Sequence, residues 1–423
     1  MTPEVSPAYR PLDPAGVVAL ISDLDSIRAR LGGTPESWQV REVGDGNLNL
    51  VFIVEGPAGA VCVKQALPYV RVAGPSWPMS LQRAFFENAY FRSVGPHVAG
   101  LIPEIYHYDA ELYCIIMQRL SPHIILRQGL MGSRRYANVG RDIGEYVARA
   151  CFFTSDLARP FECKLKEVAL FSANHELIRI SVDLIFVDPY RESARNRHTT
   201  PQLDGLVAQI RRDGRLKAAA SRFGQKFLVE AQALLHGDLH SGSVMVTDDD
   251  TRVIDPEFAF FGPIGFDLGA FFGNLLLSWF CQSGHATASD DRCAAQAHIV
   301  DQARNFWQTF SARFTALWVE HGAGDAYPPA LFARSEDATA LADARRVFME
   351  GLFADMLGFA ACKMIRRIVG FAHVADFETI REPVLRSRCE AAALRMARQL
   401  LTYPRDFAGL DAVFAALPRS GRD

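Results

Sequence analysis

Lysine is scarce in this chain, and neither sign of charge dominates. Only six lysines occur among its 45 basic residues, and 48 acidic residues leave a net charge of −3. A surface for nucleic acid or an anionic membrane needs a basic excess, so neither is expected as a partner. Glycine and proline are near average in number and dispersed, which excludes collagen-like and low-complexity chains.

Closely spaced cysteines and a long apolar run are also missing. The eight cysteines are scattered, with no Cys-x-x-Cys pair or other metal-ligand spacing, so we expect reduced thiols, no zinc and a cytoplasmic protein. Residues 1–14 lack the basic and apolar segments of a secretory signal. The longest apolar stretch, Leu268–Cys281, contains Asn274 and is too short to cross a bilayer.

The composition is that of a folded globular protein. Of the 423 residues, 49% are hydrophobic and 22% are charged, which excludes disorder for the bulk of the chain. This length fits two to three domains or one large two-lobed enzyme.

The first part of the chain has the pattern of a sheet with one inserted helix. Alternating apolar residues and turn signals predict strands at Trp38–Val43, Leu48–Glu55, Ala60–Ala66, Glu104–Tyr108 and Leu112–Gln118, with a helix at Ser80–Ser93.

After Ser121-Pro122 the pattern becomes mainly helical. Helices are predicted at Val139–Ser155, Phe223–Leu235, Gly265–Phe280, Ala297–Glu320, Asp343–Gly370 and Arg386–Leu401, and one strand pair at Ser243–Val246 and Thr251–Asp255. We therefore expect an α+β, bilobal chain, with a small β-rich lobe at 1–119 and a large helical lobe at 120–423.

The segment His236–Ser243 begins with His-Gly-Asp, and Asp255 follows Asp238 by seventeen residues in the motif Asp-Pro-Glu. Kinases use one aspartate to orient and accept the proton of the attacking hydroxyl, and a second acidic group after a hairpin to hold magnesium. Protein kinases carry Asn five residues after the first aspartate, where this chain has Ser243. The alternative is two turn-forming aspartates in an unrelated fold, and the joint spacing favours the kinase.

Residues before His236 also follow the order in which kinases carry their nucleotide-binding motifs. Gly44 and Gly46 lie between two predicted strands, as in a loop that covers phosphates, although Asn49 stands where a third glycine is expected and the pattern also fits a hairpin turn. Lys64 lies in an apolar strand, and Glu87 on the following helix is either its partner or part of a solvated face.

Three further residues are assigned structural roles. Asp267 precedes an apolar helix as a candidate N-cap and is expected to brace the catalytic loop. His236 and His240 are expected to hold backbone geometry rather than to act as bases or metal ligands.

The segments Leu235–Ser243 and Val253–Asp267 closely resemble the S-methyl-5-thioribose kinases, in the aminoglycoside-phosphotransferase-like branch of the protein-kinase-like fold. Three other segments share the resemblance: Gly44–Asn49, Gly74–Pro78 and Ile365–Asp376. The resemblance implies phosphorylation of the 1-hydroxyl of methylthioribose with ATP and Mg²⁺, in methionine salvage, by a homodimer.

The resemblance also implies roles for single residues. Asp238 is the catalytic aspartate and contacts the sugar, Arg366 with Arg367 meets substrate and phosphoryl group, and Trp77 belongs to a mobile lid. The implied nucleotide and metal residues are Asn49 and Lys64 for ATP, Gln118, Arg119 and Leu120 for the adenine hinge, and Asp255 and Glu257 for magnesium. The general kinase pattern adds Gly44, Gly46 and Glu87 to the residues expected at ATP. From the residues alone, Arg366 and Arg367 fit a solvated helix face equally well.

Two alternatives and one departure stay open. The family commonly has acidic residues where this chain has Gln118 and Arg119, which affects nucleotide preference. A kinase for an aminoglycoside, choline or homoserine is the first alternative, and a nucleotide-binding scaffold without activity is the second. For the charged segment 159–222 the sequence predicts no role.

Overall fold

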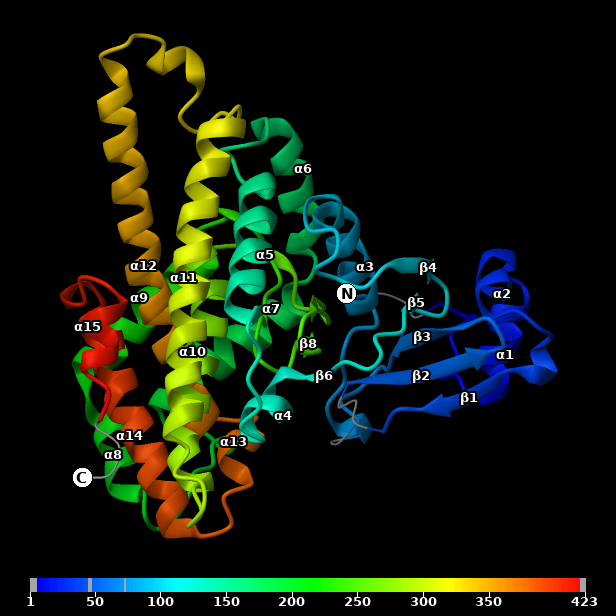
Figure 1. The fold of residues 1–423 in the computed structure, drawn as a ribbon, viewed down its shortest axis with the longest axis horizontal. Coiled ribbons are helices and arrows are strands. Elements are labelled where there is room, and N and C mark those ends of the chain that lie inside the picture. The colour runs from blue at the N-terminus through cyan, green and yellow to red at the C-terminus, as the bar shows by residue number, and fades with distance from the viewer. Residues whose placement is uncertain (1–5, 45–47, 72–73, 419–423) are drawn as a thin grey trace.

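The computed structural model describes residues 6–44, 48–71 and 74–418, and within them strands and helices separate along the chain. Figure 1 shows the N-terminal sheet at the right and the long helices at the left. The predicted α+β arrangement, with a small β-rich part before a large helical part, is confirmed. Gly46 lies outside the described residues.

The N-terminal sheet has five antiparallel strands in the order β1-β2-β3-β5-β4. Their bounds are β1 Gln39–Glu42, β2 Asn49–Gly56, β3 Gly59–Ala66, β4 Ile105–Asp109 and β5 Cys114–Gln118. Lys64 pairs with Val51 on one side and Ile115 on the other, so it lies in the middle of the sheet.

The two faces of this sheet have different neighbours because side chains alternate along a strand. Val61 and Val63 of β3 are buried in a core shared with two helices that the sequence analysis did not predict, α1 (Pro14–Ser22) and α2 (Asp25–Leu31). Lys64 points to the opposite face and meets α3 (Arg83–Val94). The alternation of β3 therefore separates the structural face from the functional one.

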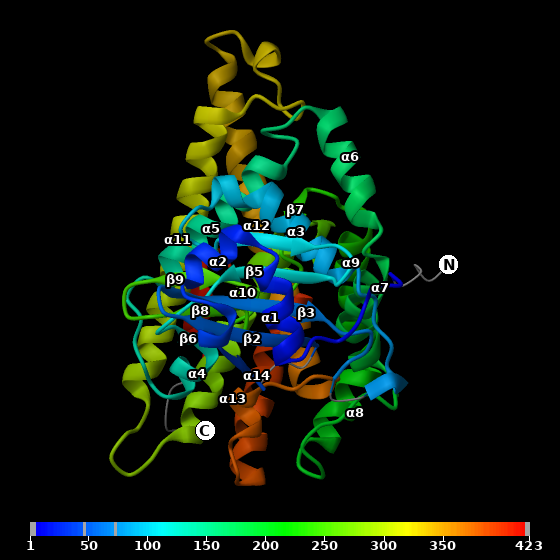
Figure 2. The same ribbon diagram turned by 90° about the vertical axis from the view of Figure 1, so that its right-hand side faces the viewer.

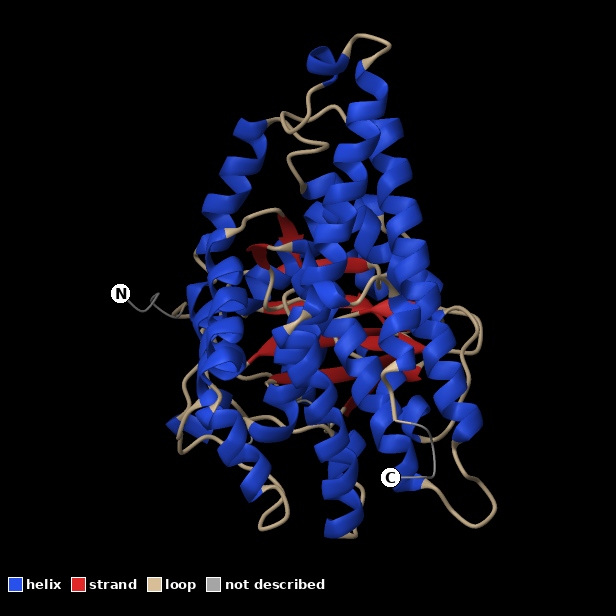
Figure 3. Cartoon of the chain, turned by 90° about the vertical axis from the view of Figure 1, so that its left-hand side faces the viewer, coloured by secondary structure: helices blue, strands red, loops and turns tan. Residues whose placement is uncertain are grey.

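The large part is built around one buried helix, α10 (Ile264–Gln282), in which every residue is buried. It packs against α11 (Cys293–His321), α12 (Asp337–Val369) and α14 (Pro383–Thr402), and the helical side in Figure 3 shows these layers in front of the strands. The span Ile264–His285 is long and apolar enough to cross a membrane, contrary to the length argument made from sequence, but all of the tested window is buried inside the molecule. It is the core helix of this part.

Two short sheets carry the motif-bearing loops. Strand β7 (Ala233–Leu235) pairs with β10 (Phe260–Gly262), and β8 (Val244–Val246) pairs with β6 (Ile124–Ile125) and β9 (Thr251–Val253). The predicted helix Phe223–Leu235 is wrong at both ends, since α9 spans Gly214–Val229. Leu234 and Leu235 extend the apolar pattern, but their backbone groups pair with β10 instead of continuing the helix.

The segment for which the sequence predicted no role is mostly helical. It contains α6 (Phe161–Ser172), α7 (His175–Ser181), a π-helical turn (Val182–Val187), α8 (Asp204–Arg212) and the start of α9. Figure 2 looks onto the N-terminal sheet and shows α6 and α11 on opposite sides of it. The other described α-helices are α4 (Leu126–Met131), α5 (Val139–Thr154), α13 (Ala375–Glu378) and α15 (Leu410–Ala415).

Candidate active site

The loop between β7 and β8 is fixed by a buried aspartate on α10. Both oxygens of Asp267 accept hydrogen bonds from this loop, from the backbone N–H of His236 at 2.7 Å and that of Gly237 at 3.1 Å. The predicted bracing contact is confirmed, but the N-cap assignment is wrong, because α10 begins at Ile264 and Asp267 lies within it. Gly237 has φ +85°, and a Cβ there would lie 2.1 Å from the carbonyl oxygen of Phe258, so the loop requires glycine.

Both histidines of this loop hold backbone and side-chain positions, as predicted. His236 Nε2 lies 2.9 Å from the carbonyl oxygen of Ile254, which ties the loop to the residue before Asp255. His240 Nδ1 accepts from the Gly242 N–H at 3.0 Å. Burial, with Arg127 and other cations nearby, lowers the pKa of His240 well below its usual value although Asp238 opposes this, so the ring is neutral at pH 7.

Ser243 stands at the position that protein kinases fill with asparagine. Its hydroxyl lies 3.1 Å from the carbonyl oxygen of Asp238 and 3.1 Å from His240 Nδ1. The serine hydroxyl therefore stabilises the conformation of the loop by contacts within the loop.

Three cations from α12 surround the carboxylate of Asp238. Lys363 Nζ lies 2.6 Å from Asp238 Oδ1, Arg367 Nη2 lies 3.6 Å from Oδ2 and Arg366 Nη1 lies 4.0 Å from Oδ1. Burial by itself raises the pKa of Asp238, but Lys363 above all, with the two arginines, outweighs it and holds the pKa well below its usual value. Asp238 is therefore ionised at pH 7.

The two arginines do not belong to a solvated helix face. Arg366 and Arg367 are 9% and 7% exposed, and they lie in a stretch of α12, Leu352–Val369, that is buried throughout. Arg367 Nη1 donates to the carbonyl oxygen of Ala372 at 3.0 Å, and the Nε of each arginine is buried and has no hydrogen-bond partner among the described residues. Both arginines thus keep unused donor capacity near Asp238.

Lys363 was missed by the sequence analysis. It precedes Arg367 by four residues and Arg366 by three, and residues with these spacings share one face of a helix. A lysine within the otherwise apolar stretch Met356–Ile365, in a chain with only six lysines, was the signal that could have found it.

A second cluster gathers around Lys64. Its Nζ lies 2.6 Å from Glu87 Oε2 on α3, which confirms the predicted ion pair, and it also donates to Asp255 Oδ1. Asp255 has φ +70°, a left-handed conformation that is uncommon outside glycine. Such conformations concentrate at functional sites, where the surrounding contacts hold them in place.

Glu257 is the buried member of this second cluster. Its Oε2 lies 3.2 Å from Arg83 Nε and 3.2 Å from Asn49 Nδ2, and Arg83 also donates to Asn49 Oδ1 at 3.1 Å. Arg83 is completely buried and was missed by the sequence analysis, because an arginine one turn before Glu87 resembles an ordinary exposed helix residue.

The acidic groups of the second cluster suit a divalent cation. Carboxylate oxygens of Glu87, Asp255 and Glu257 lie within 4.8 Å of one another. Burial raises the pKa of Glu257 and raises that of Glu87 to about 7, because neighbouring carboxylates add to the effect of burial and Lys64 only partly offsets it. Carboxylates that repel one another in this way are relieved by an oxygen-seeking ion such as Mg²⁺, so the donor set fits the predicted metal.

The predicted hinge leads out of β5. Gln118 exchanges two hydrogen bonds with Glu104, one from its own N–H at 2.8 Å and one to its Oε1 at 3.3 Å. Arg119 forms an ion pair with Glu55 of β2. The two side chains that depart from the acidic family pattern are thus engaged within the sheet, and Leu120 follows them.

The loop with Trp77 contacts the large part of the chain. The ring of Trp77 lies 5.0 Å from that of Phe371, which follows α12 directly. This contact joins the segment after β3 to the end of the helix that carries Arg366 and Arg367.

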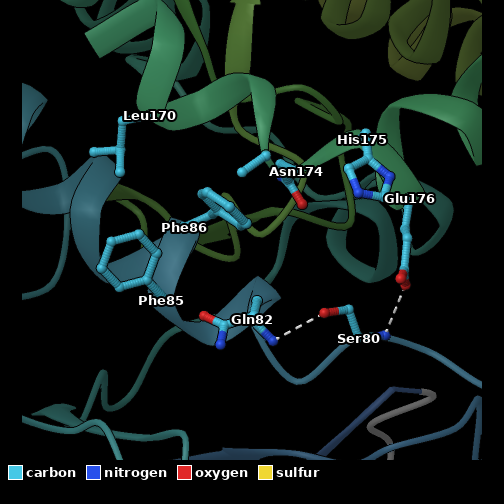
Figure 4. A pocket seen from close by; sticks show the side chains of 9 residues that line it. Ser80, Gln82, Phe85, Phe86, Leu170, Asn174, His175 and Glu176 are labelled. Carbon is cyan, nitrogen blue, oxygen red and sulfur yellow. Dashed lines mark hydrogen bonds between the residues drawn. The ribbon is translucent and has the colours of Figure 1, made fainter. Parts of the chain in front are cut away.

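Two cavities lie outside both clusters. One, of about 280 Å³, lies where α3 meets the junction of α6 and α7, and Figure 4 shows the rings of Phe85 and Phe86 with Asn174, His175 and Glu176 around it. The other, of about 670 Å³, lies between α5 and α11. None of the predicted site residues lines either one.

This geometry agrees with the similarity of the chain to known proteins. The Phosphotransferase enzyme family matches residues 39–310, so the chain belongs to that family and is a kinase-type enzyme. Methylthioribose kinase 1 of Oryza sativa subsp. japonica is 44% identical over 418 residues, 98% of this chain and 96% of the relative. Methylthioribose kinase of Escherichia coli O45:K1 (strain S88 / ExPEC) is 42% identical over 414 residues, 98% of each chain. The chain therefore belongs to the methylthioribose kinase family.

Solved structures are more distant. An ethanolamine kinase of Plasmodium vivax is 11% identical and has a TM-score of 0.45, with 90% of this chain and 87% of that chain covered. This likeness carries no argument about substrate.

Proposed function

We propose that the protein transfers the γ-phosphoryl group of ATP to the 1-hydroxyl of methylthioribose, a step of methionine salvage. The observation that carries the proposal is the ionised Asp238 among three cations of α12, in a chain whose relatives named methylthioribose kinase match it over nearly their full length. Such a carboxylate can accept the hydroxyl proton, and the cations suit the negative charge that spreads over the transferring group.

On the substrate side, we propose that Asp238 contacts the sugar hydroxyl and that Arg366 and Arg367 meet the phosphoryl group. The supporting geometry is the buried position of both arginines and the Nε of each, which has no hydrogen-bond partner among the described residues. A planar guanidinium offers paired donors to phosphate oxygens, which an ammonium group does not.

On the nucleotide side, we propose that Gly44, Gly46, Asn49 and Lys64 hold the phosphates of ATP, with Glu87 fixing Lys64, while the backbone of Gln118, Arg119 and Leu120 meets adenine. Asp255 and Glu257 would hold Mg²⁺, which would supply positive charge against the phosphates of ATP. The bond from Asn49 to Glu257 supports this, because it joins the start of β2 to the proposed metal ligand. In this proposal, residues 1–119 form the nucleotide-binding lobe and residues 120–423 form the catalytic and substrate-binding lobe.

The test is ADP release by the purified protein with ATP and Mg²⁺, comparing methylthioribose with ribose, choline, homoserine and kanamycin. We expect turnover with methylthioribose and at least about 10²-fold less with the others, because the site's polar groups must be matched by the acceptor. Turnover on choline, homoserine or kanamycin alone would keep the phosphotransferase class and reject this substrate. ATP binding without any turnover would favour the scaffold.

We also propose a homodimer, a cytoplasmic location and a lid role for the Trp77 loop. The eight cysteines all lie in described segments, and no disulfide joins them there, which supports a reducing compartment. Light scattering should give about twice the 46.9 kDa of one chain. The contact of Trp77 with Phe371 supports the lid, since it spans the two parts of the chain.

A further inference from the structure

The surroundings of Lys363 are unusual for a lysine. Its side chain is 2% exposed, and its Nζ lies 4.6 Å from the centre of the Phe266 ring on α10, in a cation–π contact. Buried lysines are rare unless they have a charge partner. Here the hydrogen-bond partner is Asp238 Oδ1, at 2.6 Å.

The contact with Lys363 makes the two oxygens of Asp238 unequal. Oδ1 accepts the hydrogen bond from Lys363, whereas Oδ2 accepts none from the residues that the structure describes, its neighbours being His240 Nε2 at 3.4 Å and Arg367 Nη2 at 3.6 Å. Oδ2 therefore keeps its acceptor capacity for an incoming hydroxyl.

We propose that Lys363 is a positioning residue, which turns the Asp238 carboxylate so that Oδ2 faces the acceptor hydroxyl and keeps that carboxylate ionised. The proposal extends the proposed function, since the acceptor is the hydroxyl that is phosphorylated. Lys363 acts through Asp238 and needs no contact with substrate.

The charged groups around Asp238 and Lys363 support this role. The charged and titratable groups that face the pair are Arg366 and Arg367 of α12, His240 of the loop and Asp267 of α10. Behind them lie Arg127 of α4, which faces His240, and His236 of the loop, which faces Asp267. Among these groups, Lys363 makes the shortest contact to Asp238. Its charge is also the strongest attraction that lowers the pKa of Asp238. Without Lys363, burial of Asp238 would be opposed only by weaker and longer contacts.

Lys363 is positively charged only over a limited pH range. Burial lowers the pKa of Lys363 to about 8, since the attraction of Asp238 only partly offsets burial and the repulsion of Arg366 and Arg367. Above that pH Lys363 becomes neutral, and Asp238 loses its nearest cation. A fall in kcat above about pH 8 is therefore expected in the wild type.

The first experiment does not need a substrate. The Asp238 carboxyl is followed by ¹³C NMR in protein labelled at aspartate, and its signal is assigned by its absence in Asp238→Asn. In Lys363→Met we expect the pKa of Asp238 to rise by at least about one unit, since an attraction within ion-pair distance is removed. An unchanged pKa would overturn the proposal whatever the acceptor proves to be.

The second experiment is the pH profile of kcat with methylthioribose. In Lys363→Met we expect a loss of about 10²-fold or more at pH 7 and an acid limb moved to higher pH, and in Lys363→Arg a return of the acid limb toward wild type. A loss that is equal at every pH would assign Lys363 to packing alone. If the NMR shift is found but the wild type does not use methylthioribose, the proposed substrate fails and the effect on Asp238 stands.

Lys226→Met is the matched control. Like Lys363, Lys226 forms an ion pair with an aspartate: its Nζ lies 2.8 Å from Oδ2 of Asp355, which lies on α12 two helical turns before Lys363. Its loss should affect stability but leave the Asp238 signal and the acid limb unchanged.

Discussion

The two charged clusters of this protein have opposite imbalances. Around Lys64, the three carboxylates of Glu87, Asp255 and Glu257 face two cations, Lys64 and Arg83. Around Asp238, a single carboxylate faces three cations from α12. The first cluster has room for one more positive charge, and the second has room for negative charge.

This difference explains how one chain can serve both partners of a phosphoryl transfer. A metal ion needs the surplus of carboxylates, and the transferring group needs the surplus of cations. The clusters are held together through His236, which lies two residues before Asp238 and whose ring contacts the carbonyl oxygen of Ile254, the residue before Asp255. Mutations that change the balance of one cluster should therefore have effects that differ in kind from those in the other.

The largest effect should follow Asp238→Asn, which removes the only carboxylate of the cationic cluster. We expect kcat to fall by about 10³-fold or more, because the acceptor for the hydroxyl proton is lost. ATP affinity, measured by calorimetry, should change little. Asp248→Asn, on the exposed turn after β8, is the control and should keep wild-type turnover. Near-normal turnover of Asp238→Asn would remove Asp238 as the acceptor.

Arg366→Lys keeps the charge of that cluster but removes the planar fork of donors. We expect a loss of about 10²-fold in kcat, since an ammonium group does not reproduce the paired bonds of a guanidinium to phosphate oxygens. Steady-state kinetics compare it with Arg381→Lys, an exposed arginine beyond α13. An unchanged rate would leave Arg366 with a packing role only.

Glu257→Gln changes the acidic cluster and should act through the metal. We expect the Mg²⁺ concentration for half-maximal rate to rise by about tenfold or more, while the rate at saturating Mg²⁺ falls less, because the donor set loses one carboxylate charge. The readout is a Mg²⁺ titration of ADP release. A titration curve that matches the wild type would contradict the assignment of two carboxylate ligands.

The smallest effect concerns a buried carboxylate outside both clusters. Glu390 on α14 is 1% exposed, and burial raises its pKa to about 7 although Thr199 and Arg386 partly oppose this. The folded protein thus holds this proton more tightly than the unfolded chain, so stability falls as pH rises from about 4.5 to 7.

Glu390→Gln should remove that dependence. Above pH 7 we expect the variant to be more stable than the wild type by about 1 kcal/mol, and below pH 4.5 the gain should disappear. Denaturant unfolding at pH 4 and pH 8 measures both. A stability difference that does not vary with pH would show that Glu390 does not titrate in this range.

Much of the site could be predicted from sequence because its parts are local motifs. His-Gly-Asp, Asp-Pro-Glu and the strand lysine each have a fixed spacing on a loop or strand, so Asp238, Asp255 and Lys64 could be named before their contacts were known. The pairing of Lys64 with Glu87 followed from the order of strand and helix. Alternation of apolar residues also located the five strands of the N-terminal sheet.

What escaped prediction depends on contacts between distant segments. Whether Arg366 and Arg367 were solvated or buried could not be read from an arginine-rich helix, since burial depends on what packs against it. Lys363 and Arg83 were missed for the same reason, as their partners lie 125 residues away at Asp238 and far along the chain at Glu257.

The sequence by itself determined the class of chemistry, which is phosphoryl transfer, and the motif residues Asp238, Asp255 and Lys64, because motif spacing is a property of the chain. Only the tertiary structure decided the charge balance of the two clusters, because α3 and α12 bring Arg83 and Lys363 to carboxylates that no local pattern connects to them. Burial then sets the pKa values of these groups, and burial exists only in the folded protein.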